Sequence, residues 1–457
     1  MSAGHPQAAR EIAAELDWRR GEAAEIILAG ARVLDPGTGL DEARDVVIRD
    51  GRIAEIASAG TAELEGAERI DAEGLIALPA FFDPHVHLRT PGREDEEDPE
   101  TGARAAAAGG YCAILAMANT DPVVDTPADI IALRERAAAE ACIPTGFLAT
   151  ATRAMAGQEL TEALELRDAG AVGISDDGLP IASSRVMRRA LAYQGLHGLQ
   201  IALHEQDPEL SAGGSMHEGE VSAELGIGGW PSVAESIMIA RDCELAAYES
   251  ARIHVQHLSA AASVEAVEAA KARGVRITCE ATPHHLVLTD EALRSLDSDF
   301  KMNPPLRTET DRQALLAGLR SGTIDCVATD HAPHAADEKA EPIEQAPFGV
   351  TGLETAFAVL YTELVMPGLL PLDLLVERMG AGARAFDFAQ PRVEPGAPAE
   401  VVLFDPALEW VVGADGWESR SRNSCFKGRR LTGRVQLTIA AGRVAFRRRS
   451  FALGVAG

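Results

Sequence analysis

Eight short apolar runs, separated by alanine-rich stretches, fill the middle of the chain, and this alternation restricts its fold more than any other feature. The runs lie at residues 78–87, 111–119, 146–152, 171–177, 200–206, 252–259, 275–284 and 325–331. They show little alternation of polar with apolar residues, as is typical of strands buried on both faces. Strands that alternate with helices form parallel sheets. We therefore predict the α/β class and a (β/α)8 barrel of the TIM type over residues 78–392.

A doubly wound open sheet is the alternative arrangement for such units. Sheets of that kind that bind nucleotides carry a G-x-G-x-x-G or Walker-type loop directly after a strand. No such loop follows any of the eight runs, and this favours the barrel.

Both ends of the chain have a different texture, with short β-type segments that are separated by glycine or aspartate turns. One group occupies residues 24–76 and the other begins at residue 399. Either group alone would form a marginal core. We therefore expect one small composite β-sandwich domain, built from residues 23–77 and 393–457, rather than two separate modules. Residues 1–22 are predicted to be an N-terminal extension, either an amphipathic or a frayed helix.

The charge and hydropathy of the chain exclude several classes of partner. The 457 residues include 70 acidic and 42 basic side chains, for a formal net charge of −28. Such a surface repels nucleic acid and anionic membranes, so we expect neither as a partner. The longest uncharged stretch, residues 105–120, is too short to cross a bilayer. The first residues lack the apolar segment of a secretory signal, and the six cysteines include no C-x-x-C pair, so we expect a cytoplasmic protein.

Potential metal ligands stand at the ends of several predicted strands. His85 and His87 close the first run, and residues two apart on a strand point to the same side. Acidic and imidazole groups end four other runs, namely Asp176 with Asp177, His204, His257 and Asp330. In a barrel, all these strand ends meet at one mouth. Histidines with carboxylates around one cavity suit zinc or another borderline divalent ion.

Several motifs together resemble the dihydroorotases of the class I bacterial type, within the amidohydrolase superfamily of metal-dependent hydrolases. They include HVHLRTPG (85–92), SDDG (175–178), VQHLS (255–259) and ATDHAPH (328–334), and the resemblance runs from about residue 24 to the end. It implies one or two Zn²⁺ per subunit. It also implies the reversible cyclisation of N-carbamoyl-L-aspartate to L-dihydroorotate in pyrimidine (UMP) biosynthesis, catalysed by a hydrolase of cyclic amide C–N bonds.

The resemblance assigns roles to individual residues by their place in the motifs. His85, His87 and Asp330 should hold the first metal, His204 and His257 the second, and Asp177 rather than Asp176 should bridge them. A metal-activated hydroxide would be the nucleophile, because two bound cations lower the pKa of a shared water to about 7. Asp330 would also be the general acid and base. The expected substrate contacts are Arg89, Asn119, Asn303, His334, Phe348 and Gly349, with Arg89 as a clamp for the substrate carboxylate.

Two other functions remain as alternatives. A hydantoinase- or allantoinase-like amidohydrolase would bridge its metals with a carboxylated lysine at the end of the fourth strand, but no lysine precedes Lys271. An inactive scaffold for aspartate transcarbamoylase would be expected to lose ligands, and all six matched positions carry competent side chains. We expect a homo-oligomer, and association with an aspartate transcarbamoylase stays open. The acidic run 93–100 is expected to be a solvated loop or a partner contact.

Overall fold

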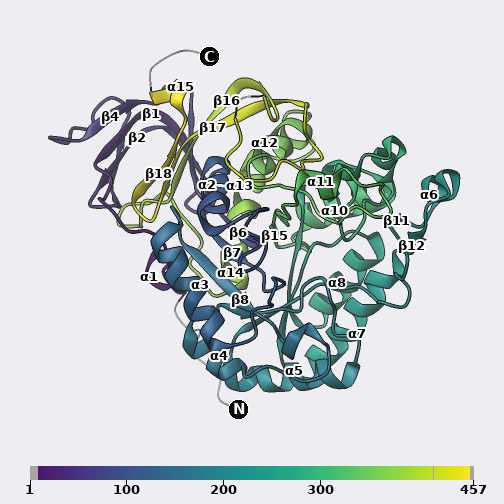
Figure 1. Ribbon diagram of the computed structural model, residues 1–457. Coiled ribbons are helices and arrows are strands. Elements are labelled where there is room, and N and C mark those ends of the chain that lie inside the picture. Colours follow the sequence, from purple (N-terminus) through teal and green to yellow (C-terminus); the bar gives the residue numbers. More distant parts are fainter. Residues whose placement is uncertain (1–8, 415, 453–457) are drawn as a thin grey trace.

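The computed structural model describes residues 9–414 and 416–452, and eight parallel strands form a barrel at its centre (Figure 1). In chain order they are β6 (Phe81–Val86), β7 (Tyr111–Ala116), β8 (Thr145–Ala149), β9 (Gly173–Ile174), β10 (Gln200–Leu203), β13 (Arg252–Val255), β14 (Arg276–Ala281) and β15 (Cys326–Val327). Each strand pairs with the next in this order. The N–H of His87 donates to the carbonyl of His331 at 2.8 Å, beside a Val86–His331 bridge, and this closes the ring. The predicted barrel is therefore confirmed.

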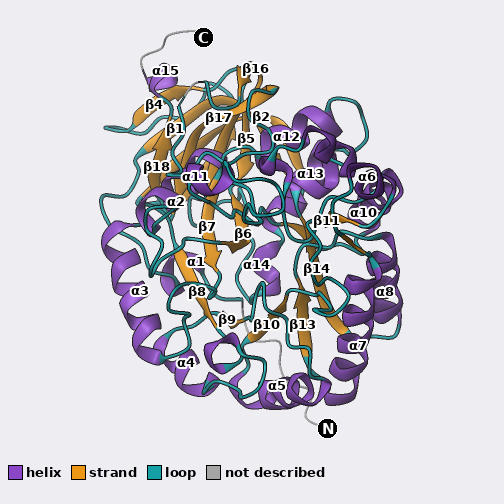
Figure 2. Ribbon diagram, turned by 45° about the vertical axis from the view of Figure 1, so that its right-hand side comes forward, coloured by secondary structure: helices purple, strands orange, loops and turns teal. Residues whose placement is uncertain are grey.

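Helices surround the barrel, as Figure 2 shows. The longer ones are α2 (Pro99–Gly109), α3 (Pro127–Glu140), α4 (Ala163–Ala169), α5 (Ser184–His197), α7 (Val233–Glu249), α8 (Ala261–Ala272), α10 (Glu309–Ser321) and α13 (Leu372–Gly380). Shorter ones are α6 (Glu220–Leu225), α9 (Pro283–Val287), α11 (Ala336–Lys339), α12 (Ala356–Leu360), α14 (Gly382–Ala385) and α15 (Arg449–Ala452), and strands β11 (Met216–His217) and β12 (Gly229–Trp230) pair in a loop. Local sequence fixes where helices begin: Thr126 and Thr308 cap α3 and α10 as capping boxes.

The two ends of the chain build one further eight-stranded sheet. Its strands are β1 (Ile26–Asp35), β2 (Leu40–Arg49), β3 (Arg52–Ser58), β4 (Glu68–Asp71), β5 (Ile76–Pro79), β16 (Val401–Val411), β17 (Arg430–Ala440) and β18 (Arg443–Arg447). β5 pairs antiparallel with β16, and this pairing joins the two ends. Aliphatic side chains from both ends, such as Leu28, Ile48 and Leu437, share one buried cluster. This is the expected composite β layer, while its exact boundaries with the barrel stay a prediction.

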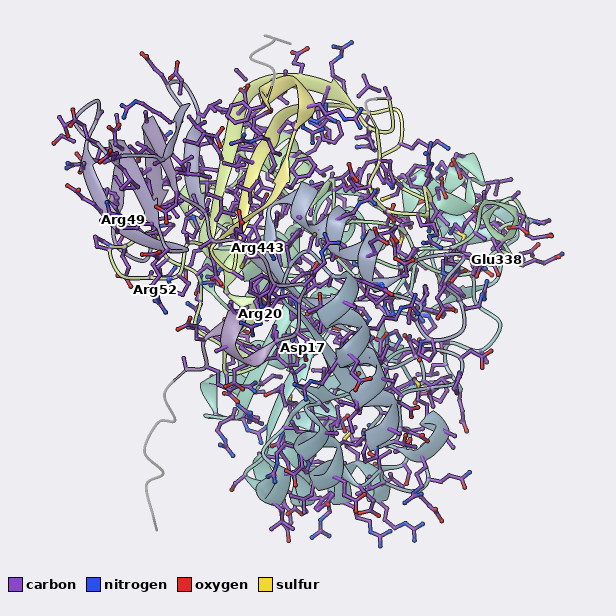
Figure 3. All side chains as sticks on the ribbon, turned by 60° about the vertical axis from the view of Figure 1, so that its left-hand side comes forward. Asp17, Arg20, Arg49, Arg52, Glu338 and Arg443 are labelled. Carbon is purple, nitrogen blue, oxygen red and sulfur yellow. The ribbon has the colours of Figure 1, made fainter. Side chains whose placement is uncertain are left out.

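The described part of the N-terminal extension packs against the barrel wall. Helix α1 (Ile12–Glu15) buries Ile12, and Leu16 and Trp18 are buried beyond it. The carbonyl of Asp17 accepts from the N–H of Thr145 at the start of β8. Figure 3 shows Asp17 and Arg20 near Arg443 of β18, whose guanidinium lies over the ring of Trp18. The first eight residues of the predicted extension lie outside the described residues. Over the described ranges, no helix combines the length and apolarity that a membrane span needs.

Candidate active site

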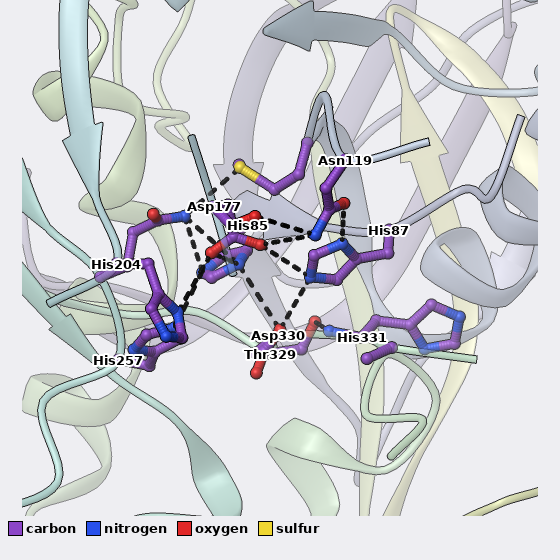
Figure 4. Close-up of polar contacts among 12 residues, drawn as sticks. His85, His87, Asn119, Asp177, His204, His257, Thr329, Asp330 and His331 are labelled. Atoms are coloured by element: carbon purple, nitrogen blue, oxygen red, sulfur yellow. Dashed lines mark hydrogen bonds and ion pairs between the residues drawn. The ribbon is translucent and has the colours of Figure 1, made fainter. Parts of the chain in front are cut away.

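His85 and His87 project from the end of β6 toward two carboxylates (Figure 4). His85 Nε2 lies 3.5 Å from Asp330 Oδ1 and 3.7 Å from Asp177 Oδ1. His87 Nε2 lies 3.0 Å from Asp330 Oδ1 and 3.5 Å from Asp177 Oδ2. Both imidazoles and both carboxylates are buried. The polar residues at the ends of the first and the last barrel strands thus lie together at the mouth of the barrel.

His204 and His257 approach Asp177 from the opposite side, as Figure 4 shows. His204 Nδ1 lies 2.9 Å from His257 Nε2 and 3.5 Å from Asp177 Oδ1. His257 Nε2 lies 3.9 Å from the same Asp177 oxygen. The structure therefore brings together all six residues expected to bind metal, with the Asp177 carboxylate between the two histidine pairs.

The donor set fits divalent ions. The ligand atoms of His85, Asp177 and His257 lie within 4.8 Å of one another, as do those of His85, His87 and Asp330. Asp177 Oδ1 is buried and accepts no hydrogen bond within the described residues, as expected of an oxygen reserved for a cation. Burial raises the pKa of Asp177, but the nearby imidazoles of His85, His204 and His87 outweigh it, so the pKa stays well below its usual value. Four imidazoles with two carboxylates are typical of zinc and similar borderline ions.

The two adjacent aspartates after β9 differ in their surroundings. Asp176 accepts from the backbone N–H groups of Ala151 and Thr152, at 2.8 and 3.0 Å, and from the Thr152 hydroxyl. Burial raises the pKa of Asp176 to about 6. Asp176 therefore holds the end of β8 in place, and Asp177 is the residue that faces the histidines.

Three residues of the site have backbones in the left-handed region, where side chains other than glycine are uncommon. Their φ angles are +56° for Arg89, +28° for His257 and +47° for Asp330. Residues in this region cost free energy, and they concentrate at functional sites. All three occur just after barrel strands, where the chain turns sharply to place the side chain at the mouth.

Glu280 is a buried residue of the site that sequence reasoning missed. Its Oε1 lies 2.6 Å from His85 Nδ1 and accepts from the N–H of His257 at 3.2 Å. Its Oε2 lies 2.9 Å from His254 Nε2. Burial raises the pKa of Glu280, but the charge of His85 lowers it by a larger amount, and the resulting pKa is about 2. The signal available in the sequence was a charged residue within the apolar run 275–284, since such a residue needs a buried partner.

The six expected substrate contacts line one cavity of about 180 Å³ beside the histidines. The lining residues are His87, Arg89, Asn119, Asp177, Gly178, His204, His257, Asn303, Asp330, Ala332, His334, Phe348 and Gly349. A volume below the usual 300 Å³ of drug-sized pockets suits a small ligand. The cavity therefore places a cationic side chain, Arg89, at the same opening as the candidate metal ligands.

Arg89 is held in a defined position at this mouth. Its Nε donates to the carbonyl of Pro333 at 3.0 Å, and Nη2 lies 3.2 Å from His334 Nε2. Burial lowers the pKa of His334 to about 3, with the Arg89 charge as the next cause, so this imidazole is neutral. His334 Nε2 also lies 2.8 Å from the carbonyl of Phe348. A half-buried guanidinium that is fixed in this way is suited to bidentate binding of a carboxylate.

The other expected substrate contacts also bind protein groups. Asn119 Oδ1 lies 2.9 Å from His87 Nδ1, and its Nδ2 donates to Asp177 Oδ2 at 3.1 Å. The N–H of Gly349 donates to the carbonyl of Lys301 at 2.9 Å. Gly349 has φ of +129°, and a Cβ there would lie 2.6 Å from that of Ala332. These residues shape the cavity wall in addition to facing its interior.

The expectation that residues 93–100 form a solvated loop is wrong for the acidic residues at its centre, while Asp95 and Glu100 are exposed. Glu96, Glu97 and Asp98 are buried. Glu97 lies 3.1 Å from His331 Nε2 and accepts from the Ser419 hydroxyl, while Glu96 lies 3.2 Å from His334 Nδ1. These acids are buried because partners distant in the chain supply the donors that compensate their charge. The loop thereby supports the side of the cavity that carries Arg89.

Known proteins of related sequence share one description. The family model "Dihydro-orotase-like" matches residues 74–263. A dihydroorotase of Pelotomaculum thermopropionicum is 44% identical over 93% of this chain and 99% of its own length, and one of Geobacter sp. is 44% identical over 92% and 99%.

Solved structures of similar fold include hydantoinases and dihydropyrimidinases. The L-hydantoinase (dihydropyrimidinase) of Arthrobacter aurescens superposes with a TM-score of 0.82 at 25% identity, covering 92% of this chain and 96% of that one. The dihydropyrimidinase of Brevibacillus agri gives a TM-score of 0.80 at 24% identity, covering 92% and 95%. At this identity the likeness supports the barrel fold.

Proposed function

This chain belongs to the dihydroorotase family, and we propose that it interconverts N-carbamoyl-L-aspartate and L-dihydroorotate by closing and opening a cyclic amide. Curated relatives that are 41–45% identical over nearly their whole length carry this name. The observation that carries the proposal is the cavity, which Arg89 lines together with five of the six clustered metal-type ligands. A substrate with one carboxylate beside a cyclic amide matches that pair of features.

We propose zinc, one or two ions per subunit, as the metal of this metal-dependent family. His85, His87 and Asp330 would hold one ion, His204 and His257 the other, with Asp177 shared between them. A bound divalent ion supplies Lewis acidity and lowers the pKa of a water nucleophile. All four lysines of the chain lie beyond residue 270, so Asp177 takes the place that a carboxylated lysine after β9 would have.

Asp330 is the residue we propose for proton transfer. It lines the cavity, and its Oδ1 is 3.0 Å from His87 Nε2. Burial raises the pKa of Asp330, but the charge of His85 and the hydrogen bond from His87 lower it below its usual value, so the group is an ionised base at neutral pH. In ring opening it would accept the proton of the attacking water and deliver it to the leaving amide nitrogen. In ring closure it would remove the proton from the carbamoyl nitrogen.

Arg89 would select the anionic ring over uncharged ones. The protein carries a net charge of −28, so an anionic substrate needs a local cation, and the half-buried guanidinium beside neutral His334 provides it. Asn119, Phe348 and Gly349 would complete the wall around the carboxylate, and Asn303 would face the ring. Hydantoin and dihydrouracil lack that carboxylate.

The test is turnover of L-dihydroorotate, hydantoin and dihydrouracil by the purified chain, with metal content measured on the same sample. We expect hydrolysis of dihydroorotate and at most weak activity on the uncharged rings. Activity on the uncharged rings alone would replace this proposal by a hydantoinase-like function. A metal-loaded protein inactive on all three would support the scaffold alternative.

We also propose a role in pyrimidine biosynthesis in the cytoplasm, as a homo-oligomer. The support is the family, whose reaction closes the ring of the pyrimidine precursor. Association with aspartate transcarbamoylase is the partner to test, by size-exclusion chromatography with light scattering on the chain alone and with that enzyme. A monomer that does not co-elute with the transcarbamoylase would contradict the proposed assembly and leave the catalytic proposal intact.

A further inference from the structure

The side chain of Gln206 lies between a candidate metal ligand and a candidate substrate contact. Its Oε1 is 2.8 Å from His204 Nε2 and 2.9 Å from Asn303 Nδ2. We propose that Gln206 is a positioning residue that couples the metal site to Asn303 and turns the Asn303 carbonyl oxygen toward the substrate as a hydrogen-bond acceptor. This proposal rests on the proposed function, since it concerns the metal and substrate of the same site.

The chemistry of His204 fixes the orientation of the Gln206 amide. His204 Nδ1 is the nitrogen that faces Asp177 and His257, so it is the one available to a metal. A neutral imidazole that binds metal through one nitrogen carries its proton on the other. His204 Nε2 is then a donor, and the Gln206 atom beside it must be the acceptor, Oε1.

The other end of the Gln206 side chain gives the same orientation independently. Its second amide atom lies 2.7 Å from the Ser211 hydroxyl, which itself donates to the carbonyl of Asp207 at 2.8 Å. Because that hydroxyl proton is already used, the Ser211 oxygen accepts from Gln206, and the atom beside it must be Nε2. Both ends of the amide are therefore determined by their partners.

The orientation passes on to Asn303. Since Gln206 Oε1 accepts, the Asn303 atom beside it is the amide nitrogen, and Oδ1 is left on the other side. Asn303 Oδ1 is buried, accepts no hydrogen bond within the described residues, and belongs to a side chain that lines the cavity. A buried acceptor without a partner costs free energy unless a ligand satisfies it. The matching ligand group is an N–H, and the ring of a cyclic amide such as dihydroorotate carries one.

The metal and the substrate specificity are thus linked through one amide. A ligand that replaced the ring N–H by an acceptor would face Asn303 Oδ1 with like polarity, and a site built to pair with an N–H rejects such a ligand strongly. Gln206 belongs neither to the clustered metal-type ligands nor to the cavity lining, so it acts through His204 and Asn303.

The experiment compares Gln206→Met, Gln206→Glu and Asn303→Ala with wild type, measuring Zn²⁺ affinity without substrate and KM for dihydroorotate with zinc in excess. Gln206→Met removes the shared acceptor, so we expect Zn²⁺ affinity to fall about 10- to 100-fold and KM to rise about tenfold. Gln206→Glu keeps an acceptor for both partners and should restore both values to near wild type. Asn303→Ala should raise KM similarly and leave Zn²⁺ affinity unchanged. In the double variant Gln206→Met with Asn303→Ala, KM should rise no further than in either single variant.

Gln313→Met, on the exposed face of α10, is the matched control for the change of side chain. Additive effects on KM, or a Gln206→Met protein that binds Zn²⁺ as wild type does, would overturn the coupling. So would Gln206→Glu being as defective as Gln206→Met, because a merely structural loss of the amide would not be rescued by a carboxylate. If wild type fails to hydrolyse dihydroorotate, the proposed function fails, and the Zn²⁺ measurements still decide whether Gln206 positions His204.

Discussion

Replacing Glu280 by glutamine should weaken metal binding without disturbing the fold. The carboxylate contacts His85 Nδ1 at 2.6 Å and the N–H of His257 at 3.2 Å, so it orients two candidate ligands that both lie near Asp177 Oδ1. Glutamine keeps an oxygen in that position and loses only the charge. Its amide nitrogen can face His254, since that imidazole can accept at Nε2 and donate from Nδ1 to Thr278. The variant therefore isolates the electrostatic contribution.

The magnitude follows from what the carboxylate does for His85. A carboxylate on the far nitrogen makes a ligating histidine more basic, and its loss typically costs 10- to 100-fold in metal affinity. Because glutamine keeps the geometry, we expect the lower end, about tenfold or about 1.4 kcal/mol. Glu280→Leu also removes the acceptors for His85, His257 and His254, and should lie at the upper end or beyond.

The assay is competition for Zn²⁺ against a chromophoric chelator at pH 7, with the melting temperature of the metal-free proteins as a check on folding. Glu268→Gln, on the exposed side of α8, provides a matched charge change without these contacts and should bind as wild type does. A Glu280→Gln protein that folds normally and holds Zn²⁺ as tightly as Glu268→Gln would refute the reasoning.

Three further predictions concern substrate, protons and stability. Arg89→Ala should raise KM for dihydroorotate about 10- to 100-fold, because a charged hydrogen bond is worth roughly 1.5–3 kcal/mol, and an unchanged KM would remove Arg89 as the clamp. Asp330→Asn should lower kcat at least 100-fold, measured on samples with matched zinc content; wild-type turnover would exclude it as the proton carrier. Burial raises the pKa of Glu354 from 4.5 to about 7. Between pH 4.5 and 7 the folded state therefore binds more protons than the unfolded state, so this carboxyl lowers the free energy of unfolding as the pH rises through that range. Glu354→Gln, which keeps the acceptor for the N–H groups of Glu418 and Ser419, should be more stable than wild type at pH 8 by as much as about 3 kcal/mol and equal to it near pH 4; equal urea midpoints at both pH values would contradict this.

The barrel and the cluster of ligands were predictable because both follow from local patterns. Apolar runs bounded by helical stretches locate strands whatever the rest of the chain does, and strand ends converge in any barrel. His87 and Asp330, 243 residues apart, could be placed together on that basis alone. The choice of Asp177 over Asp176 came from the family resemblance, and the geometry agrees, since Asp176 binds the end of β8.

The surroundings of these residues could not be predicted, because they depend on pairings across the fold. Glu97 reads as part of an acidic surface run, yet it is buried by donors from His331 and from residues 419–420. The roles of Glu280 and Gln206 follow only from the histidines that they contact in the folded protein, His85 and His204. Whether a polar side chain is solvated or satisfied internally is a property of its neighbours, and a single sequence does not state which neighbours those are.

The closure of the barrel lies at the centre of the site. The hydrogen bond from His87 to His331 joins the first strand to the segment after the last one, and His87 and Asp330 stand on either side of that seam. An ion bound between them would cross-link the first and the last segments of the barrel, and its binding free energy would stabilise the closed barrel. Chelation should therefore loosen the protein first at the seam between β6 and β15, so that the loss of catalytic competence and the first step of unfolding become one event.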